Sequence, residues 1–216
     1  MKNLFKLLLI IIIISGQWII AQDTGYKITI RWTDHIDGDF SFADNWSYPE
    51  GIYPNQFGQV SCDGLCPPET DEMKDENGKI KEEQLTAFYQ LVDTTHQYHS
   101  IRSEAHTYEW AGTDFMQVKR INQDSVIGQT SNNVATHSSL YMVITQNQVE
   151  PTIVLTSITP NGSSTFNCTD GSLTINRSLW EQGIMQAAFY FIFDEVMSDG
   201  QPMWWKGLIY AKIADE

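Results

Sequence analysis

The sequence predicts a mainly β, single-domain protein, built as an antiparallel β-sandwich or barrel of about eight or nine strands. Alternation of apolar and polar residues recurs from Tyr98 to the end of the chain, as in half-buried strands. Helical periodicity is convincing in one place only, residues 79–96. A chain of 216 residues can build one large core and is short for two, so residues 22–216 are expected to form one domain.

The first 21 residues have the order of a secretory signal peptide. Lys2 and Lys6 flank a short positive segment, an aliphatic run covers residues 7–14, and Ala21 offers a small residue for cleavage. The apolar stretch is interrupted and shorter than the about 20 residues of a spanning helix. We therefore expect an exported chain, secreted or periplasmic, with no stable membrane insertion after cleavage. A retained N-terminal anchor is the alternative.

The mature chain is expected to open with a strand and a long ordered loop. Residues 26–33 alternate between apolar and polar side chains. Residues 34–75 are dense in Gly, Pro, Asp and Asn, but they also carry six aromatic residues, which is too much apolar area for disorder. This segment is therefore predicted to be an ordered loop that its cysteines staple.

One amphipathic helix and a series of strands complete the prediction. The helix covers residues 79–96, where an apolar stripe at helical spacing would pack on a sheet, and Asn77-Gly78 supplies the turn before it. Strands are expected at 98–111, 115–121, 125–130, 139–145, 152–157, 172–176, 185–193 and 203–213.

The charge of the chain limits its partners. The net charge is −14, and it becomes −16 once Lys2 and Lys6 leave with residues 1–21. Nucleic acid is not an expected partner, because affinity for phosphates comes from Lys and Arg that release counterions. The same charge disfavours anionic membrane surfaces. Surplus carboxylates also have the ordinary effect of keeping an exported protein soluble.

Three cysteines, Cys62, Cys66 and Cys168, would enter an oxidising compartment, so at least one pair is expected to be bonded. The C-x3-C spacing around Gly64 favours a Cys62–Cys66 disulfide, and pairing of either cysteine with Cys168 is the alternative. The spacing is not C-x-x-C, and no basic residue nearby would lower a thiol pKa, so redox catalysis is not expected.

A histidine cluster is the first candidate metal site. Two histidines stand three residues apart at the end of the predicted helix, and Glu and His follow on the next strand, a donor set that suits zinc. The alternative is that the first histidine caps the helix C-terminus and the others are hydrogen-bonded or exposed. The candidate zinc ligands are His96, His99, Glu104 and His106.

An acidic loop is the second candidate metal site. Calcium takes six to eight oxygen ligands, and four closely spaced carboxylates can supply much of that number. An ordinary solvated turn is the alternative. The candidate calcium ligands are Asp34, Asp37, Asp39 and Asp44.

Aromatic residues form the third candidate site. Trp204 and Trp205 are adjacent on a predicted strand, so they point to opposite faces, and one of them is expected outside the core. Aromatic rings beside Asn, Gln and Asp are typical of carbohydrate sites, where the ring stacks on the sugar and polar groups take its hydroxyls. Burial of the rings between sheet and loop is the alternative. The candidate ligand-binding residues are Trp46, Tyr48, Tyr53, Trp110 and Trp204.

The motifs of nucleophilic, phosphate-binding and dinucleotide-binding sites are absent from the sequence. The segments Asn45–Gly51, Ser61–Pro67 and Tyr108–Asp114, together with Trp205-Lys206-Gly207, resemble uncharacterised secreted proteins of Bacteroidota. The resemblance covers about residues 34–213 and implies a bacterial, exported, single-domain protein. No activity and no catalytic residue are carried over with it.

These observations predict a secreted or periplasmic binding protein of the bacterial envelope, with a polysaccharide, an envelope glycan or an envelope protein as its partner. An enzyme is the less favoured class. Its form would be a zinc hydrolase using His96, His99 and His106, with Glu104 or Glu109 as general base. A structural envelope protein with none of these sites is the third alternative.

Overall fold

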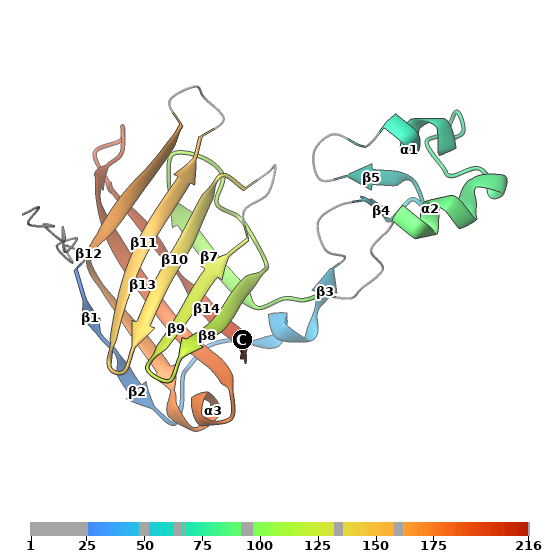
Figure 1. Cartoon of the computed structure of the whole chain (residues 1–216). Coiled ribbons are helices and arrows are strands. Elements are labelled where there is room, and N and C mark those ends of the chain that lie inside the picture. The colour runs from blue at the N-terminus through green and yellow to red at the C-terminus, as the bar shows by residue number, and fades with distance from the viewer. Residues whose placement is uncertain are drawn as a thin grey trace, which may run out of the picture.

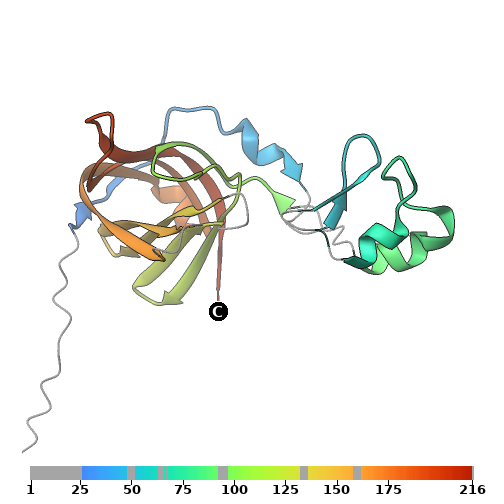
Figure 2. The same cartoon turned by 90° about the horizontal axis from the view of Figure 1, so that it is seen from above.

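The computed structural model describes residues 26–47, 52–62, 66, 68–91, 97–131, 136–157 and 162–215. A β-barrel and a smaller lobe, formed by residues 52–91, are visible in Figure 1 and from above in Figure 2. The predicted signal segment lies outside the described residues, as do Tyr48 and His96. Within these ranges, no helix has the length and apolar character needed to cross a membrane.

Seven strands close the barrel. They pair in the order β11, β10, β9, β8, β14, β13 and β12, and β12 pairs again with β11. This confirms the prediction of a mainly β sandwich or barrel, with the barrel as the form adopted. The barrel strands are β8 (Met116–Asn122), β9 (Ser125–Thr130), β10 (Ser138–Thr145), β11 (Gln148–Thr156), β12 (Ser163–Asn176), β13 (Ile184–Val196) and β14 (Pro202–Ala214).

Short strands lie where neighbouring barrel strands diverge. β1 (Ile28–Thr29) pairs with β11, and β2 (Arg31–Thr33) pairs with β12, so the predicted strand over residues 26–33 is divided between two partners. β7 (Ile101–His106) pairs with the first part of β14, whose last residues pair with β8. The sheet is not wholly antiparallel as predicted, because β2 is parallel to β12 and β14 is parallel to β8.

Alternating side chains of β13 and β14 fill the barrel. Phe191 and Trp205 are fully buried, and the indole N–H of Trp205 donates to the Ser103 hydroxyl at 3.0 Å. Trp204 is only partly buried, so the two adjacent tryptophans do face opposite ways. The barrel interior is therefore packed with side chains along these strands, and a ligand site must be sought on its outside or at its ends.

The long strand β12 bends at Gly171. This residue has a φ of 150°, and a Cβ at this position would collide with the Tyr190 carbonyl oxygen of β13. The register between the two strands also shifts between Cys168 and Asp170. Glycine is required here because β12 must approach β13 closely while it turns from one neighbour to the next.

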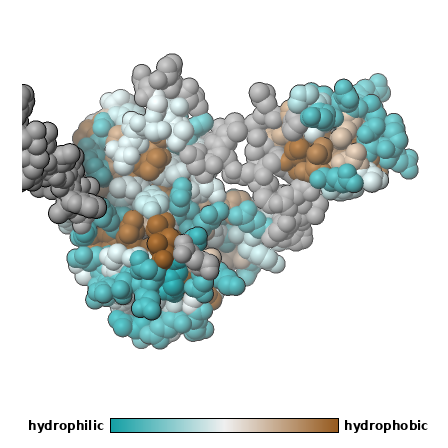
Figure 3. All heavy atoms as spheres, viewed as in Figure 1, coloured by the Kyte–Doolittle hydropathy of each residue, from teal (hydrophilic) through white to brown (hydrophobic). Residues whose placement is uncertain are grey.

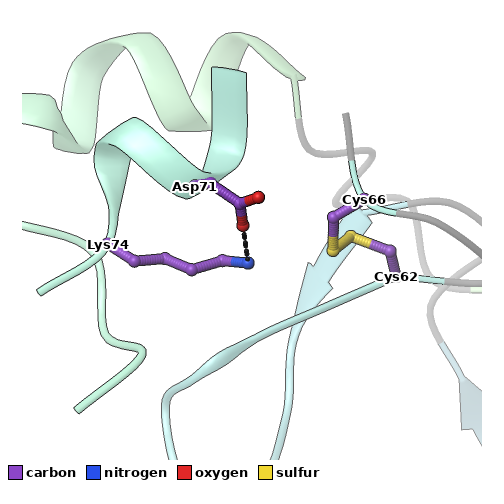
Figure 4. The surroundings of a disulfide bond; sticks show 4 residues. All are labelled: Cys62, Cys66, Asp71 and Lys74. Atoms are coloured by element: carbon purple, nitrogen blue, oxygen red, sulfur yellow. Dashed lines mark hydrogen bonds and ion pairs between the residues drawn. A yellow bond between two sulfur atoms is a disulfide. The ribbon is translucent and has the colours of Figure 1, made fainter. Parts of the chain in front are cut away.

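A disulfide bond cross-links two residues of the lobe. Cys62 and Cys66 form a disulfide with a Cα–Cα distance of 5.3 Å, as predicted, and Cys168 remains free (Figure 4). Near the disulfide, Lys74 pairs with Asp71 at 2.9 Å. The lobe elements are β4 (Ile52–Pro54), β5 (Val60–Cys62), α1 (Pro68–Met73), the 3-10 helix η2 (Glu82–Gln84) and α2 (Leu85–Leu91).

In the part of the segment 34–75 that the structure describes, the residues do not form one loop. Its first part carries the 3-10 helix η1 (Ser41–Asp44) and β3 (Trp46–Ser47), and its second part belongs to the lobe. β3 pairs with β6 (Gln97–Tyr98), so the chain leaves for the lobe and returns from it at the same place. The remaining helix, α3 (Arg177–Glu181), connects β12 with β13 at the opposite end of the barrel from the β7–β8 connection.

The predicted helix over residues 79–96 is wrong in its start and in its packing. Lys79 and Ile80 form β-bridges with Gln59 and Lys74, so helical structure starts only at η2. The helix α2 does not cover the barrel sheet. Phe88 is buried within the lobe, whereas Leu85 is exposed, and Figure 3 shows apolar residues at the lobe surface. Residues 92–96 lie outside the described part of the chain.

Candidate functional site

Residues 107–115 connect β7 to β8 across one end of the barrel, and we call them the end strap. The predicted strand over residues 98–111 ends at His106, so Tyr108 and Trp110 lie beyond the end of β7. The Thr107 hydroxyl donates to the Glu109 carbonyl at 2.7 Å, which stabilises the turn at this point.

One side of the end strap is attached to the start of β10. The Trp110 carbonyl accepts hydrogen bonds from the backbone N–H groups of His137 (2.8 Å) and Ser138 (3.1 Å). The Thr136 hydroxyl donates to the Gly112 carbonyl at 2.8 Å. The backbone of Trp110 is therefore held firmly while its indole ring is 68% exposed.

The other side of the end strap reaches β12 and β13. The Tyr108 hydroxyl donates to Glu195 at 2.6 Å, and its ring lies 5.9 Å from that of Phe166. The hydrogen bond to the Glu195 carboxylate raises the pKa of Tyr108 above its usual value, so the phenol keeps its proton. The strap is thus bonded to strands on both sides of the barrel end.

A cavity of about 390 Å³ lies against β7 and the end strap. This volume falls within the range of small-ligand sites. Two aromatic rings, those of Tyr108 and Trp110, and the polar side chains of His106 and Glu109 border it. The combination of exposed rings and fixed polar groups makes this the best-formed candidate site in the described residues.

Glu109 is the central polar group of the site. The Ser157 hydroxyl donates to its Oε1 at 2.8 Å, and His137 Nδ1 lies 3.9 Å from its Oε2. In a serine triad the imidazole lies between the hydroxyl and the carboxylate, whereas here the carboxylate lies between the other two. The order of these three groups therefore differs from that of a serine triad.

His106 links the cavity to the outer face of β14. Its Nδ1 lies 3.1 Å from the Pro202 carbonyl, which can only accept, so this nitrogen carries a proton. Its Nε2 lies 3.3 Å from Asp199, and its ring lies 6.2 Å from that of Trp204. The imidazole is therefore held through Nδ1 and packs beside the outward tryptophan.

The structure does not bring the candidate zinc ligands together. His99 Nε2 lies 2.6 Å from the Ser47 hydroxyl near the start of β7, and His106 lies at the other end of the strand, roughly 20 Å away at the rise of an extended chain. Glu104 pairs with Lys206 at 2.9 Å. Among the described residues, which exclude His96, no group of three His, Cys, Asp or Glu side chains could hold a metal ion.

The candidate calcium ligands are directed at different partners. Asp34 accepts from the Ser178 hydroxyl at 3.2 Å, and Asp37 lies 3.1 Å from His35 Nε2. Asp39 is bonded to Arg102 at 2.8 Å. Asp44 is the last residue of η1.

The candidate aromatic residues fall into two groups. Trp110 and Trp204 both lie at the end of β7. Trp110 borders the cavity together with His106, and the His106 ring packs beside that of Trp204. Trp46 lies near the start of β7 in β3, and Tyr53 belongs to β4 of the lobe. Tyr108, His137 and Ser157 were not among the predicted site residues. Their roles depend on the turn at Thr107 and on loops distant in sequence.

Comparison with protein-family models, with curated proteins and with solved structures found no match to this chain.

Proposed function

We propose that this protein is an exported binding protein for a polysaccharide or an envelope glycan, with the end strap as its binding surface. The observation that carries the proposal is the indole of Trp110, which is 68% exposed although the residue's carbonyl accepts two backbone hydrogen bonds. An exposed aromatic ring on a fixed backbone is pre-organised for stacking, and little conformational entropy is lost when a sugar ring packs on it.

Polar groups around the cavity match the other requirement of a sugar, which presents hydroxyls that both donate and accept. The Glu109 carboxylate can accept, and the imidazole of His106 is held at its rim. Tyr108 adds a second ring, 49% exposed, next to these groups. A sugar in the cavity would therefore meet a stacking surface and hydrogen-bonding partners at once.

Export is supported by three separate observations. Residues 1–21 have the order of a signal peptide, and the Cys62–Cys66 disulfide suits an oxidising compartment. The resemblance to secreted proteins of Bacteroidota agrees with both. A polysaccharide or envelope glycan is the ligand class that such a protein would meet outside the cytoplasm.

Affinity electrophoresis tests the proposal. The protein is run through gels that contain a soluble glucan, xylan, mannan or polyuronate, and at least one polymer is expected to retard it. Trp110→Ala should weaken that binding about tenfold, because the stacking surface is lost. Tyr89→Ala is the matched control, since this lobe residue is similarly exposed (60%) and should leave binding unchanged.

Two results would contradict the proposal. One is that no polymer retards the protein, and the other is that Trp110→Ala binds as well as the wild type. Trp46→Ala distinguishes the end strap from the predicted aromatic loop. If Trp46→Ala removes binding and Trp110→Ala does not, the ligand binds near β3 instead.

A further inference from the structure

A second hollow, of about 420 Å³, lies on the outer face of three adjacent strands, β7, β14 and β13. Two rows of outward side chains cross these strands. One row, which we call the upper row, consists of Glu104, Lys206 and Tyr190, which are direct neighbours in the sheet register. The other row, which we call the lower row, consists of Arg102 and Leu208. The side chains between the rows point into the barrel, so the hollow is a trough with a backbone floor.

Gly207 lies in the floor of this trough, opposite Ser103 of β7. A Cβ at Gly207 would collide with the Arg102 carbonyl oxygen and approach the Ser103 Cα at 2.8 Å. The glycine thus allows β7 and β14 to lie very close together, which keeps the floor of the trough continuous across both strands.

The charges on the trough are balanced. Lys206 pairs with Glu104 at 2.9 Å, and Arg102 pairs with Asp39 at 2.8 Å. These side chains are all substantially exposed, so they can exchange part of these contacts for a ligand's hydroxyls. The protein has a net charge of −14, and neither cation of the trough is unpaired. A polyanion would therefore be repelled, whereas a neutral polyhydroxyl ligand finds donors and acceptors together.

Aromatic surface is also available along the trough. Tyr190 is exposed in the upper row, and the Lys206 ammonium lies 5.1 Å from the ring of Trp204. Residues 38–42 cover the same sheet face beyond the lower row, where the ring centroids of Phe40 and Tyr210 lie 6.3 Å apart. The segment also reaches Leu208, which Gly38 contacts, so the part left open for a ligand extends from Lys206 to Trp204.

The trough and the cavity at the end strap are neighbours along β7. Ser103 borders both hollows, and His106, which borders the cavity, packs beside Trp204. The strand from Ser103 to His106 covers about 10 Å, so the two hollows together are longer than one sugar unit.

We infer that the trough and the end strap bind successive units of one neutral, linear glycan chain, so that the protein contacts several units of a polysaccharide at once. This inference rests on the proposed function of the end strap and extends it to the ligand's charge and chain length. One unit stacks on Trp110, the chain passes over His106 and Trp204, and a further unit lies in the trough beside Tyr190.

Chain-length dependence tests this inference. Titration calorimetry is carried out with disaccharides up to octasaccharides of the polymer that retards the protein. The octasaccharide should bind at least about tenfold more tightly than the disaccharide, because only a long chain reaches both hollows. The polymer or polymers that retard the protein should be neutral, and retardation by a polyuronate would contradict the inference.

Variants separate the two hollows. Tyr190→Ala and Lys206→Met should each weaken octasaccharide binding about tenfold and leave disaccharide binding unchanged, whereas Trp110→Ala should weaken both. Tyr89→Ala is the control. If Trp110→Ala acts as expected but the octasaccharide gains nothing, or Tyr190→Ala and Lys206→Met have no effect, the extended site is wrong and the proposed function stands. If no polymer binds, or Trp110→Ala has no effect, both are wrong.

Discussion

Cys168 illustrates how position inside the barrel sets the chemistry of one residue. It is free and 2% exposed, and burial raises the pKa of its thiol to about 11. Only a small fraction of such a thiol is ionised near neutral pH, and the thiolate is the reactive form. The unpaired cysteine is therefore protected in spite of the oxidising surroundings expected for the chain.

Cys168 should resist iodoacetamide in the native protein at pH 8 and react once the chain is unfolded in guanidinium chloride. Both low thiolate content and lack of access lead to this result. Mass spectrometry of alkylated peptides measures it, with the unfolded sample as the control. Native labelling at the rate of a small free thiol would contradict the buried position.

Asp39 is a surface residue that stabilises the fold in a pH-dependent way. Hydrogen bonds from the Ser41 hydroxyl and from Arg102 hold the pKa of its carboxyl well below the usual range. A lowered pKa in the folded state means that the contribution to stability is present above the unfolded pKa of about 4. It is lost as the pH falls through the folded value.

Asp39→Asn should lower the free energy of unfolding at pH 7, and the difference from the wild type should shrink as the pH is lowered below about 4. Urea unfolding at several pH values measures this difference. Glu76→Gln, an exposed carboxylate of the lobe, is the control and should change little at any pH. If the loss of unfolding free energy caused by Asp39→Asn instead increased as the pH was lowered, the result would contradict a lowered pKa of Asp39 in the folded state.

Among the elements, β12 depends strongly on a single position, Gly171. Gly171→Ala should destabilise the protein by about 2–4 kcal/mol, because the residue has a φ of 150° and the new Cβ meets the Tyr190 carbonyl. Gly200→Ala is the matched control, since its φ is 80° but no atom lies within 4 Å of the added Cβ. Urea unfolding of the two variants compares them. Equal losses would mean that the close approach of β12 to β13 is not important.

The boundaries of the strand predicted at residues 125–130 are those of β9, and the long, strongly alternating strands were also located correctly. Residues 185–193 and 203–213 were expected to be strands, and they lie within β13 and β14. The prediction failed at the end of β7, where Tyr108 and Trp110 continue the alternation although the chain has left the sheet. The turn there is stabilised by a side-chain hydrogen bond of Thr107, which period-2 patterning does not register.

At the scale of the whole molecule, the lobe and the barrel are joined through a narrow base. β3 and β6 pair Trp46 with Tyr98, so the two ends of the connection are held side by side (Figure 1). The lobe has its own hairpin, disulfide and short helices, and Phe88 is its buried apolar side chain in α2. The barrel core is formed by other residues.

Replacing residues 52–91 with a short Gly-Ser linker should leave the barrel folded, with a melting temperature within a few degrees of the full chain. The reason is that β3 and β6 already bring the ends of the linker together. Circular dichroism and thermal melting measure the result, and glycan binding at the end strap should be retained. An unfolded or aggregated product would show that the barrel needs the lobe.

Local patterning predicted the mainly β class, the strongest strands and the opposite directions of Trp204 and Trp205, and it favoured the Cys62–Cys66 pair over pairing with Cys168. Each of these follows from a period of two residues or from a short spacing. The closure of β11 on β12, the short helix at Leu85 and the site beneath the end strap needed the assembled fold. Their contacts join residues far apart in the chain, such as Glu109 with Ser157 and Tyr108 with Glu195, and no local period encodes which distant partner a strand or turn will meet.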